Sequence, residues 1–361
     1  MTNNMDIEAL RNEVGQLADP ETGRTLESTG QLKSLDVDGE RLVCQIQLSS
    51  HSFPIQDEFK DRVEETIRTS AANPASTASV QVEISEFDRP PVAIGQIGLQ
   101  AKSVIAVGSG KGGVGKSTVA ASLALTLAKS GAKVGLMDAD VYGPSIPHLL
   151  GLSGRPEVIN NKIQPIYFEK LPVMSMGFMV EEDQAVIWRG PMLHGAITQF
   201  LRDTYWGNLD YLIIDMPPGT GDIALTLSQM VPLTGAVVVC TPQQVALLDA
   251  VKAISMFGKT KIPMLGMVEN MSGFICPDNG KRYDIFGHGG AREKAEELGV
   301  PFLGDIPLNI QLRQESDGGQ LNSALEDPIC FAALDKIARA VCRRINDRAA
   351  ATPNGPALPV L

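Results

Sequence analysis

The sequence predicts an α/β fold in which a doubly wound, mostly parallel sheet follows a small α+β domain. Two patterns predict it. Short apolar runs alternate with helical segments from residue 102 onward, whereas the first 87 residues carry only a few strands and helices. The change of pattern divides the 361 residues into a small domain (1–87), a linker (88–101), a large domain (102–348) and a tail (349–361). Pro90, Pro91, Gly95 and Gly98 mark the linker, and the tail, rich in Ala and Pro, is expected to be disordered.

The first 87 residues predict a small α+β unit. Apolar residues recur at helical spacing over 6–17 and again over about 55–70. Residues 41–48 alternate between apolar and polar, and Asp38-Gly39 before them favours a hairpin with the preceding segment. Val80 to Ile84 is expected to form the last strand.

The large domain is expected to hold a parallel sheet with helices on both faces. Its predicted strands are the apolar runs 104–107, 134–137, 211–214, 236–240, 265–268 and 302–306. A closing helix over about 328–348 carries an apolar stripe. We interpret the stripe as the face of the helix that packs on the sheet. An amphipathic membrane anchor is the less common alternative.

A complete phosphate-binding loop lies between the first of these strands and the helix after it. Gly110, Gly115, Lys116 and Ser117 match G-x-x-x-x-G-K-S/T. Glycines allow backbone N–H groups to face phosphates, and the helix N-terminus adds partial positive charge. Lys116 is expected to reach the β- and γ-phosphates, and Ser117 to ligate magnesium. The residues expected to hold the nucleotide are Gly110, Lys111, Gly112, Gly113, Val114, Gly115, Lys116, Ser117 and Thr118.

Two acidic motifs fall at the ends of predicted strands, where open α/β sheets place their ligands. One is Met137-Asp138-Ala139-Asp140, and the other runs from Ile213 through Asp215 to Asp222. Asp215 is expected to hold magnesium through water, and Asp140 to orient an attacking water. The segment 219–221 is a candidate sensor of the γ-phosphate. Either aspartate alone could instead cap a helix or form a turn.

The composition argues against several classes of protein. A net charge of −11 and a pI near 4.9 argue against general affinity for nucleic acid or anionic membranes. No apolar run has the length of a membrane span, and the N-terminus lacks the features of a signal peptide. Five scattered cysteines do not suggest a disulfide framework, so we expect a cytoplasmic protein.

Together these motifs resemble the deviant-Walker ATPases of the Mrp type, the iron–sulfur cluster carrier proteins of the MinD/ParA superfamily. The residues that carry the resemblance are Gly-Lys-Gly-Gly-Val-Gly-Lys-Ser-Thr with its additional Lys111, Asp-Ala-Asp-Val-Tyr-Gly-Pro-Ser and Asp-Met-Pro-Pro-Gly-Thr-Gly-Asp. The resemblance covers about 102–345. The small N-terminal domain resembles a unit found in iron–sulfur assembly factors.

The resemblance implies an ATP-hydrolysing homodimer with ATP, Mg²⁺ and an iron–sulfur cluster as its ligands. Lys111 would cross to the nucleotide of the partner subunit, as an arginine finger does. The predicted catalytic residues are therefore Lys111 together with Lys116, Asp140 and Asp215. Asn270 matches the position whose amide recognises adenine. A solvated loop lysine and a turn asparagine are the alternatives for Lys111 and Asn270.

The sequence departs from this family at the cluster-binding segment. Family members usually carry Cys-x-x-Cys here, but this chain has Cys276 followed by Asn279 at the second position. An asparagine amide is a poor substitute for a thiolate, so a dimer would offer two Cys276 thiolates and need other ligands, such as His288 or exogenous thiols. Cys276 could also be a packing residue, and His288 a surface residue.

The remaining cysteines are interpreted as packing residues. Cys44 lies on the apolar face of a predicted strand, and Cys240, Cys330 and Cys342 lie in apolar patterns. The N-terminal domain has Phe53 where its relatives carry a reactive cysteine, which makes it a candidate docking module.

The function predicted from the sequence is a homodimer that hydrolyses ATP and transfers iron–sulfur clusters to apoproteins. Two alternatives involve no metal: a nucleotide-switched adaptor, and a MinD- or ParA-like spatial regulator.

Overall fold

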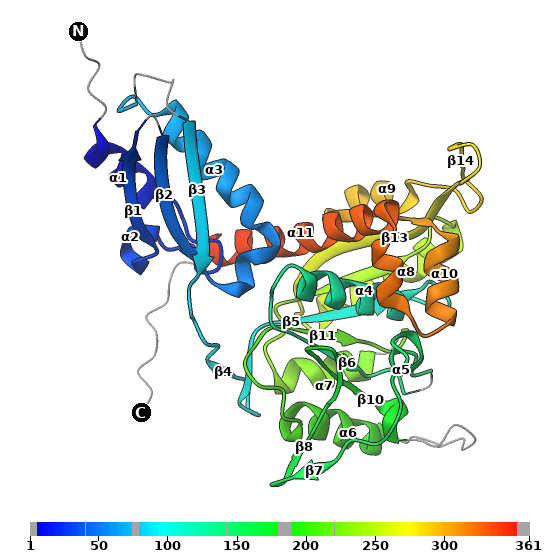
Figure 1. The fold of residues 1–361 in the computed structure, drawn as a ribbon. Helices are drawn as coiled ribbons and strands as arrows, with labels where there is room; N and C mark the ends of the chain where they lie inside the picture. The colour runs from blue at the N-terminus through cyan, green and yellow to red at the C-terminus, as the bar shows by residue number, and fades with distance from the viewer. Residues whose placement is uncertain are drawn as a thin grey trace. The chain divides into compact units, whose positions relative to one another are not determined.

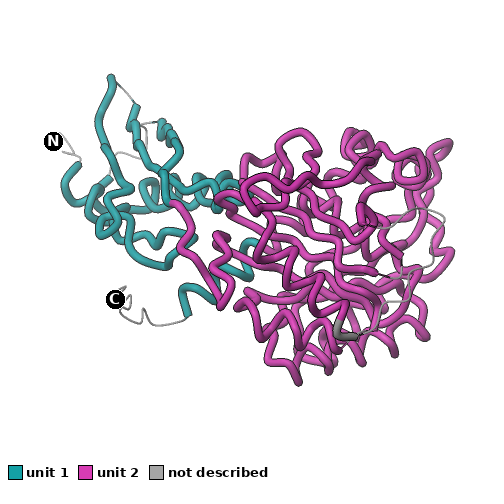
Figure 2. Tube along the Cα trace, turned by 90° about the horizontal axis from the view of Figure 1, so that it is seen from below, with its two compact units in different colours: residues 1–89, 342–361 teal, residues 90–341 magenta. Residues whose placement is uncertain are grey.

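The fold is known from a computed structural model that describes residues 6–39, 41–73, 79–141, 143–179, 190–219 and 221–351. The chain divides into two compact units (Figure 2). Unit 1 comprises residues 1–89 with 342–361, and unit 2 comprises residues 90–341. Unit 2 contains a large, mostly parallel sheet, which confirms the predicted fold class.

Unit 1 forms because its strands and helices each have one apolar face. Strand β2 shows strict alternation, with Leu42, Cys44, Ile46 and Leu48 buried. It pairs antiparallel with β1 through a turn at Gly39 (φ +62°) and parallel with β3. The elements are α1 (Ile7–Gly15), α2 (Leu26–Thr29), β1 (Leu32–Asp38), β2 (Arg41–Leu48), η1 (Ser50–Ile55), α3 (Gln56–Thr69) and β3 (Ser79–Glu86).

Unit 2 is built on one long sheet (Figure 1). Among the described residues the strand order is β14-β13-β12-β5-β11-β6-β10-β9, with β15 beside β13 and β4 beside β5. The strands are β4 (Ala93–Ile94), β5 (Leu99–Ser109), β6 (Val134–Asp138), β9 (Ile166–Phe168), β10 (Leu171–Ser175), β11 (Leu209–Asp215), β12 (Gly235–Cys240), β13 (Met264–Ile275), β14 (Arg282–Tyr283) and β15 (Phe302–Leu308), besides the separate hairpin of β7 (Val158–Ile159) and β8 (Lys162–Ile163).

Helices cover both faces of this sheet. Alternate residues such as Val104, Leu212 and Val238 share one core with residues of α6 to α9, whereas α4 contacts β5, β6 and β11. The helices of unit 2 are α4 (Lys116–Lys129), α5 (Ile146–Leu149), η2 (Met176–Met179), α6 (Gly190–Asp203), α7 (Gly221–Met230), α8 (Gln244–Lys259), α9 (Gly290–Leu298), α10 (Ile310–Asp317) and η3 (Leu321–Glu326); α11 (Pro328–Ala351) begins here and continues into unit 1.

The parallel register brings several strand ends to one edge of the sheet. Asp215 of β11 lies beside Val107 of β5 on one side and Asp138 of β6 on the other. Parallel strands expose their carboxyl ends at a common edge, which is the usual ligand edge of an open α/β sheet.

Some boundaries differ from those expected. Strand β5 begins at Leu99, inside the predicted linker, because Leu99 and Ala101 are buried and pair in the sheet. Residues 349–351 continue α11, so the prediction of disorder was wrong for them, and 352–361 lie outside the described residues. The predicted γ-phosphate sensor includes Thr220, and the Asp-Ala-Asp motif includes Tyr142; both residues also lie outside the described part.

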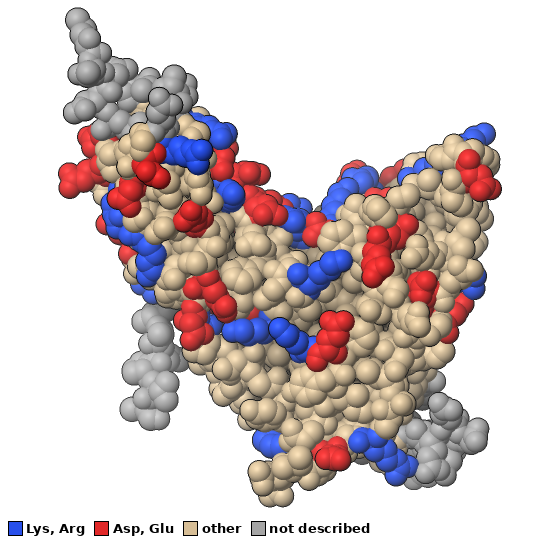
Figure 3. All heavy atoms as spheres, viewed as in Figure 1, with Lys and Arg blue, Asp and Glu red and all other residues tan. Residues whose placement is uncertain are grey.

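The surface carries charges of both signs. Acidic and basic side chains are interspersed on the face shown in Figure 3. Within the described residues, no helix has the length and apolar character required to cross a membrane.

A buried polar network holds unit 1 together around Asp19, whose side chain is completely inaccessible. One carboxylate oxygen accepts a hydrogen bond from Gln31 at 3.1 Å, and the other accepts from Thr22 Oγ1 at 2.7 Å and Arg89 at 2.8 Å. Burial acts to raise the pKa of Asp19, but the hydrogen bonds from Thr22, Arg89 and Gln31 outweigh it and leave the pKa lowered.

We expect Asp19→Asn to destabilise unit 1 by about 1–3 kcal/mol at pH 7, because the network loses its charged acceptor. Since the pKa is lower in the folded state, this stabilisation is present above the unfolded pKa of about 3.9 and is lost as the pH falls through the folded pKa. Pulsed hydrogen–deuterium labelling of β2 after equilibration in urea measures the difference. Asp36→Asn, at an exposed position of β1, is the control. A pH-independent difference would contradict the electrostatic explanation.

Candidate functional site

The phosphate-binding loop connects β5 to α4, as the sequence predicts. Its close packing requires glycine at two positions. A Cβ atom on Gly110 would lie 2.0 Å from the carbonyl oxygen of Asp249, and one on Gly115 would lie 2.2 Å from Asn270 Nδ2. Gly115 also has a φ of +79°, in the left-handed region. The loop is therefore fixed by contacts with α8 and β13.

Four predicted site residues meet where this loop enters α4. Lys116 is 6% exposed, and its Nζ lies 2.6 Å from Asp215 Oδ1, 3.4 Å from Asp140 Oδ2 and 3.2 Å from Ser117 Oγ. Asp215 is fully buried. Burial raises its pKa, and the ammonium of Lys116 opposes that rise. Three separate segments thus place one cation and two carboxylates at one point.

Asp138 is a residue of this site to which the sequence analysis assigned no role. Its carboxylate is fully buried at the end of β6 and accepts hydrogen bonds from the backbone of Asp140 at 3.0 Å, the backbone of Ile146 at 3.2 Å and Ser175 Oγ at 2.9 Å. Burial and then the negative charge of Asp215 raise the pKa of Asp138 to about 8. The available signal was its place at the end of an apolar run, two residues before Asp140. Its partner Ser175 is in β10, a strand that was not predicted.

Asn270 lies at the wall of a cavity beside the loop. Its Nδ2 donates a hydrogen bond to the carbonyl oxygen of Val114 at 2.9 Å. The cavity has a volume of about 480 Å³. Besides Asn270 it is lined by Gly115 and Thr118 of the loop and helix, and by the segment 307–310, which spans the end of β15 and the start of α10. The sequence analysis assigned no role to this segment; the available signal was its position directly after the predicted strand 302–306, at the ligand edge of the sheet.

Lys111 is half-buried in the loop. Ser109 Oγ donates to its backbone carbonyl oxygen at 2.9 Å. Within the described residues, its ammonium forms no hydrogen bond or ion pair, unlike that of Lys116. The two lysines of the loop therefore have different environments: one is held among carboxylates of its own chain, and the other is not.

Cys276 begins the turn between β13 and β14. Its N–H donates to the carbonyl oxygen of Lys281 at 3.0 Å, and its own carbonyl oxygen accepts from Gly280 at 2.8 Å. Asn279 Oδ1 accepts a hydrogen bond from the N–H of Lys281 at 2.9 Å. The amide oxygen of Asn279 thus closes the turn at the position where family members usually carry the second cysteine.

His288 lies in the loop between β14 and α9. Its side chain is 60% exposed and its Nδ1 lies 3.4 Å from Asp284 Oδ2. The loop that carries it is anchored by buried Glu269, which accepts from the backbone of Gly289 and Ala291, each at 2.7 Å. In the described part of the chain, no three His, Cys, Asp or Glu side chains gather as a metal site.

The other cysteines are buried, as the sequence predicts. Cys44, Cys240, Cys330 and Cys342 are at most 1% exposed. Burial raises the pKa of Cys44 and of Cys240 to about 12 and that of Cys330 to about 11, so these thiols are poor sources of thiolate. All five cysteines are described, and Cys276 is the half-buried one among them.

The fold and the loop define a nucleotide-binding protein of the P-loop class. Residues 100–342 match the ParA family of NUBPL iron-transfer P-loop NTPases, and the chain belongs to this family. This confirms the resemblance predicted from the motifs.

Curated relatives extend the similarity over nearly the whole chain. The iron–sulfur cluster carrier protein of Deinococcus radiodurans is 44% identical and covers 94% of this chain and 96% of its own length. That of Synechocystis is also 44% identical, with coverages of 83% and 86%. Among solved structures, a nucleotide-binding protein of Archaeoglobus fulgidus in complex with ADP is 43% identical, with a TM-score of 0.57; the match covers 64% of this chain and 91% of that one.

Two glycines of the loop provide a matched test of its geometry. We expect Gly115→Ala to lower the free energy of unfolding by about 1–3 kcal/mol, because a Cβ there is strained and displaces Asn270. Gly112→Ala meets no atom within 4 Å at a φ outside the left-handed region, so it should be neutral or slightly stabilising. Urea unfolding of the full chain compares them. Equal stabilities would contradict the proposed packing of Gly115 against Asn270.

Proposed function

We propose that this chain is an ATP-hydrolysing homodimer that carries an iron–sulfur cluster on Cys276 and delivers it to apoproteins. The observation that carries the ATPase is the convergence of Lys116, Asp140 and Asp215 beneath a phosphate-binding loop. The family and the curated relatives support the carrier role.

The donor atoms at the loop fit Mg²⁺, a hard cation that prefers oxygen ligands. Asp215 Oδ2 is buried near Ser117 and accepts no hydrogen bond of normal geometry from the described residues. Ser117 Oγ would ligate the ion, and Asp215 would hold it through water. Mg²⁺ at this place would neutralise negative charge on the phosphates. Lys116 would exchange part of its ion pairing with Asp215 for the β- and γ-phosphate oxygens.

Hydrolysis requires an oriented water and stabilised negative charge. Asp140 accepts a hydrogen bond from the attacking water. The water oxygen bonds to the γ-phosphorus while the bond to the β–γ bridging oxygen breaks; ADP keeps that electron pair, and the water proton passes to the phosphate product. Lys111, unpaired with the described residues of its own chain, stabilises the transferring phosphoryl group in the partner subunit.

The cargo site is the turn after β13. Cys276 is the accessible thiol, and a dimer supplies two such thiolates to one cluster. The remaining ligands come from exogenous thiols or from His288. The same strand carries Asn270, which contacts the phosphate-binding loop, and leads directly into Cys276. Nucleotide state therefore acts on the cluster turn through β13.

A second candidate is a nucleotide-switched adaptor that binds partner proteins without a cluster. The orientation of Asn279 favours it, because the amide oxygen that stands at the second ligand position is engaged by Lys281 N–H. Iron loading separates the two candidates.

A mixing experiment tests the role of Lys111 in the partner's site. Lys111→Ala and Asp140→Ala should each bind ATP and lose about 10²–10³-fold in hydrolysis. After subunit exchange at equal amounts, half of the dimers are mixed, and each has one site with an intact Asp140 facing an intact Lys111. Hydrolysis should therefore recover to roughly a quarter of the native rate. No recovery in demonstrably mixed dimers would show that Lys111 acts within its own subunit.

Anaerobic reconstitution with iron and sulfide tests the cargo site. We expect the native chain to bind a labile cluster, Cys276→Ala to bind none, and Asn279→Cys to bind a more stable one, because a second thiolate per subunit completes the ligand set. Visible absorption and iron per dimer provide the measurement, and Cys342→Ala, at a buried position, is the control. Equal, near-zero iron in the native chain and Cys276→Ala would favour the adaptor.

A further inference from the structure

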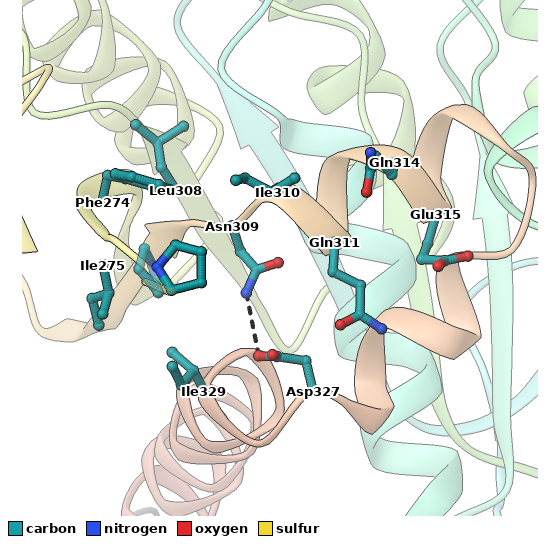
Figure 4. Close-up of a pocket in the computed structure, with 12 residues that line it drawn as sticks. Phe274, Ile275, Leu308, Asn309, Ile310, Gln311, Gln314, Glu315, Asp327 and Ile329 are labelled. Atoms are coloured by element: carbon teal, nitrogen blue, oxygen red, sulfur yellow. Dashed lines mark hydrogen bonds between the residues drawn. The ribbon is translucent and has the colours of Figure 1, made fainter. Parts of the chain in front are cut away.

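A second cavity, which we call the groove, is lined by both sequence neighbours of Cys276; Figure 4 shows its lining residues. Its volume is about 470 Å³, in the range of pockets that bind small molecules or peptide side chains. Ile275 and Pro277, the residues on either side of Cys276, form one wall. The end of β15 with Asn309, helix α10 and the first turn of α11 contribute most of the others, including Gln311 and Ile329.

The groove combines apolar and acidic groups. Ile310 and Ile329 are 48% and 45% exposed, so the groove offers apolar surface to a ligand. Glu315 and Asp327 also line the groove, and none of the described lining residues is basic. Asp327 is held by Asn309 Nδ2 at 3.2 Å and by the N–H of Cys330 at 2.7 Å, whereas Glu315 forms no ion pair with the described residues. The complementary ligand is therefore an apolar group next to a cation.

The groove shares a wall with the cavity at Asn270, where the predicted role of that residue places the base of the nucleotide. Phe274 of β13 and the segment 307–310 line both spaces. A base bound in one cavity would thus contact the side chains and backbone that shape the other. This arrangement links the groove to the nucleotide on one side and to Cys276 on the other.

We propose that this groove is the docking site for an extended segment of the recipient apoprotein, in which apolar side chains flank a lysine or arginine. The proposal rests on the proposed carrier function. The apolar side chains cover Ile310 and Ile329, and the cation pairs with Glu315 at the acidic rim. Because Ile275 and Pro277 flank Cys276, a recipient docked here has its own ligand cysteines next to the cluster. Nucleotide binding changes the affinity of the groove through the shared wall.

The direct test is the binding of a fluorescein-labelled heptapeptide, Gly-Ser-Leu-Lys-Leu-Ser-Gly, to the full chain, measured by fluorescence anisotropy. Its counterpart with glutamate in place of lysine is the matched control. We expect the lysine peptide to bind at least tenfold more tightly, and Glu315→Lys to abolish that preference. Glu296→Lys, an equal charge change at an exposed position of α9, should leave it intact. Absence of binding, or equal binding of both peptides, would overturn the docking site.

A second measurement links binding to cluster transfer. The lysine peptide should slow transfer from the loaded native chain to apo-aconitase, whereas the glutamate peptide should not. Glu315→Lys should load the same amount of iron as the native chain but transfer it several-fold more slowly at low recipient concentration. Peptide binding without effect on transfer would exclude the groove as the recipient's site. Failure of the native chain to load a cluster would instead refute the carrier function, and the peptide titration would remain interpretable without it.

The titration is repeated with saturating Mg²⁺ and ADP to test the shared wall. We expect the affinity for the lysine peptide to shift by about threefold or more, because Phe274 and the segment 307–310 contact both ligands. An unchanged affinity would remove nucleotide control from the proposal.

Discussion

The ion pairing of Lys116 with Asp215 and Asp140 is the constraint around which the functional part of the molecule is arranged. A buried ammonium is costly unless carboxylates lie beside it. Of these two carboxylates, Asp215 ends β11, and Asp140 lies two residues after the end of β6. The pairing therefore requires β5, β6 and β11 to be adjacent and in register. The same charges give the site its chemistry, because a lysine held by carboxylates can exchange them for phosphate oxygens.

Strand β13 connects the phosphate-binding loop to the turn of Cys276, where we propose that the cluster binds. It contributes Asn270 to the phosphate-binding loop, buries Glu269 to anchor the loop around His288, and ends at the turn of Cys276. Met271, between these points, has a φ of +59°, a conformation that costs energy for a residue with a side chain. A single strand thus connects the phosphate-binding loop to the proposed cluster site. The groove beside Cys276 shares Phe274 of this strand, so three candidate binding surfaces meet along it.

The five cysteines fall into two groups, four buried thiols that pack in the core and the half-buried Cys276. Four thiols fill apolar positions in strands and helices, and burial raises the pKa of three of them. Cys276 lies in a turn that is closed by backbone hydrogen bonds, and its side chain is half-buried. Asn279 closes that turn by accepting a hydrogen bond from the N–H of Lys281. In the proposed carrier, one thiolate per subunit would hold a cluster less firmly than two.

Local patterns in the sequence determined the fold class, most of the strands, the phosphate-binding loop and its residues, because periodicity and glycine spacing are read over a few neighbouring positions. Strand β10 was missed because Leu171 to Ser175 is short and interrupted by Pro172. The role of Asp138 depended on it, since its partner Ser175 is 37 residues away. The contact between Asn270 and Val114 and the groove beside Cys276 likewise join distant segments. The tertiary structure decided these features because they arise only when separate strand ends meet at one edge of the sheet.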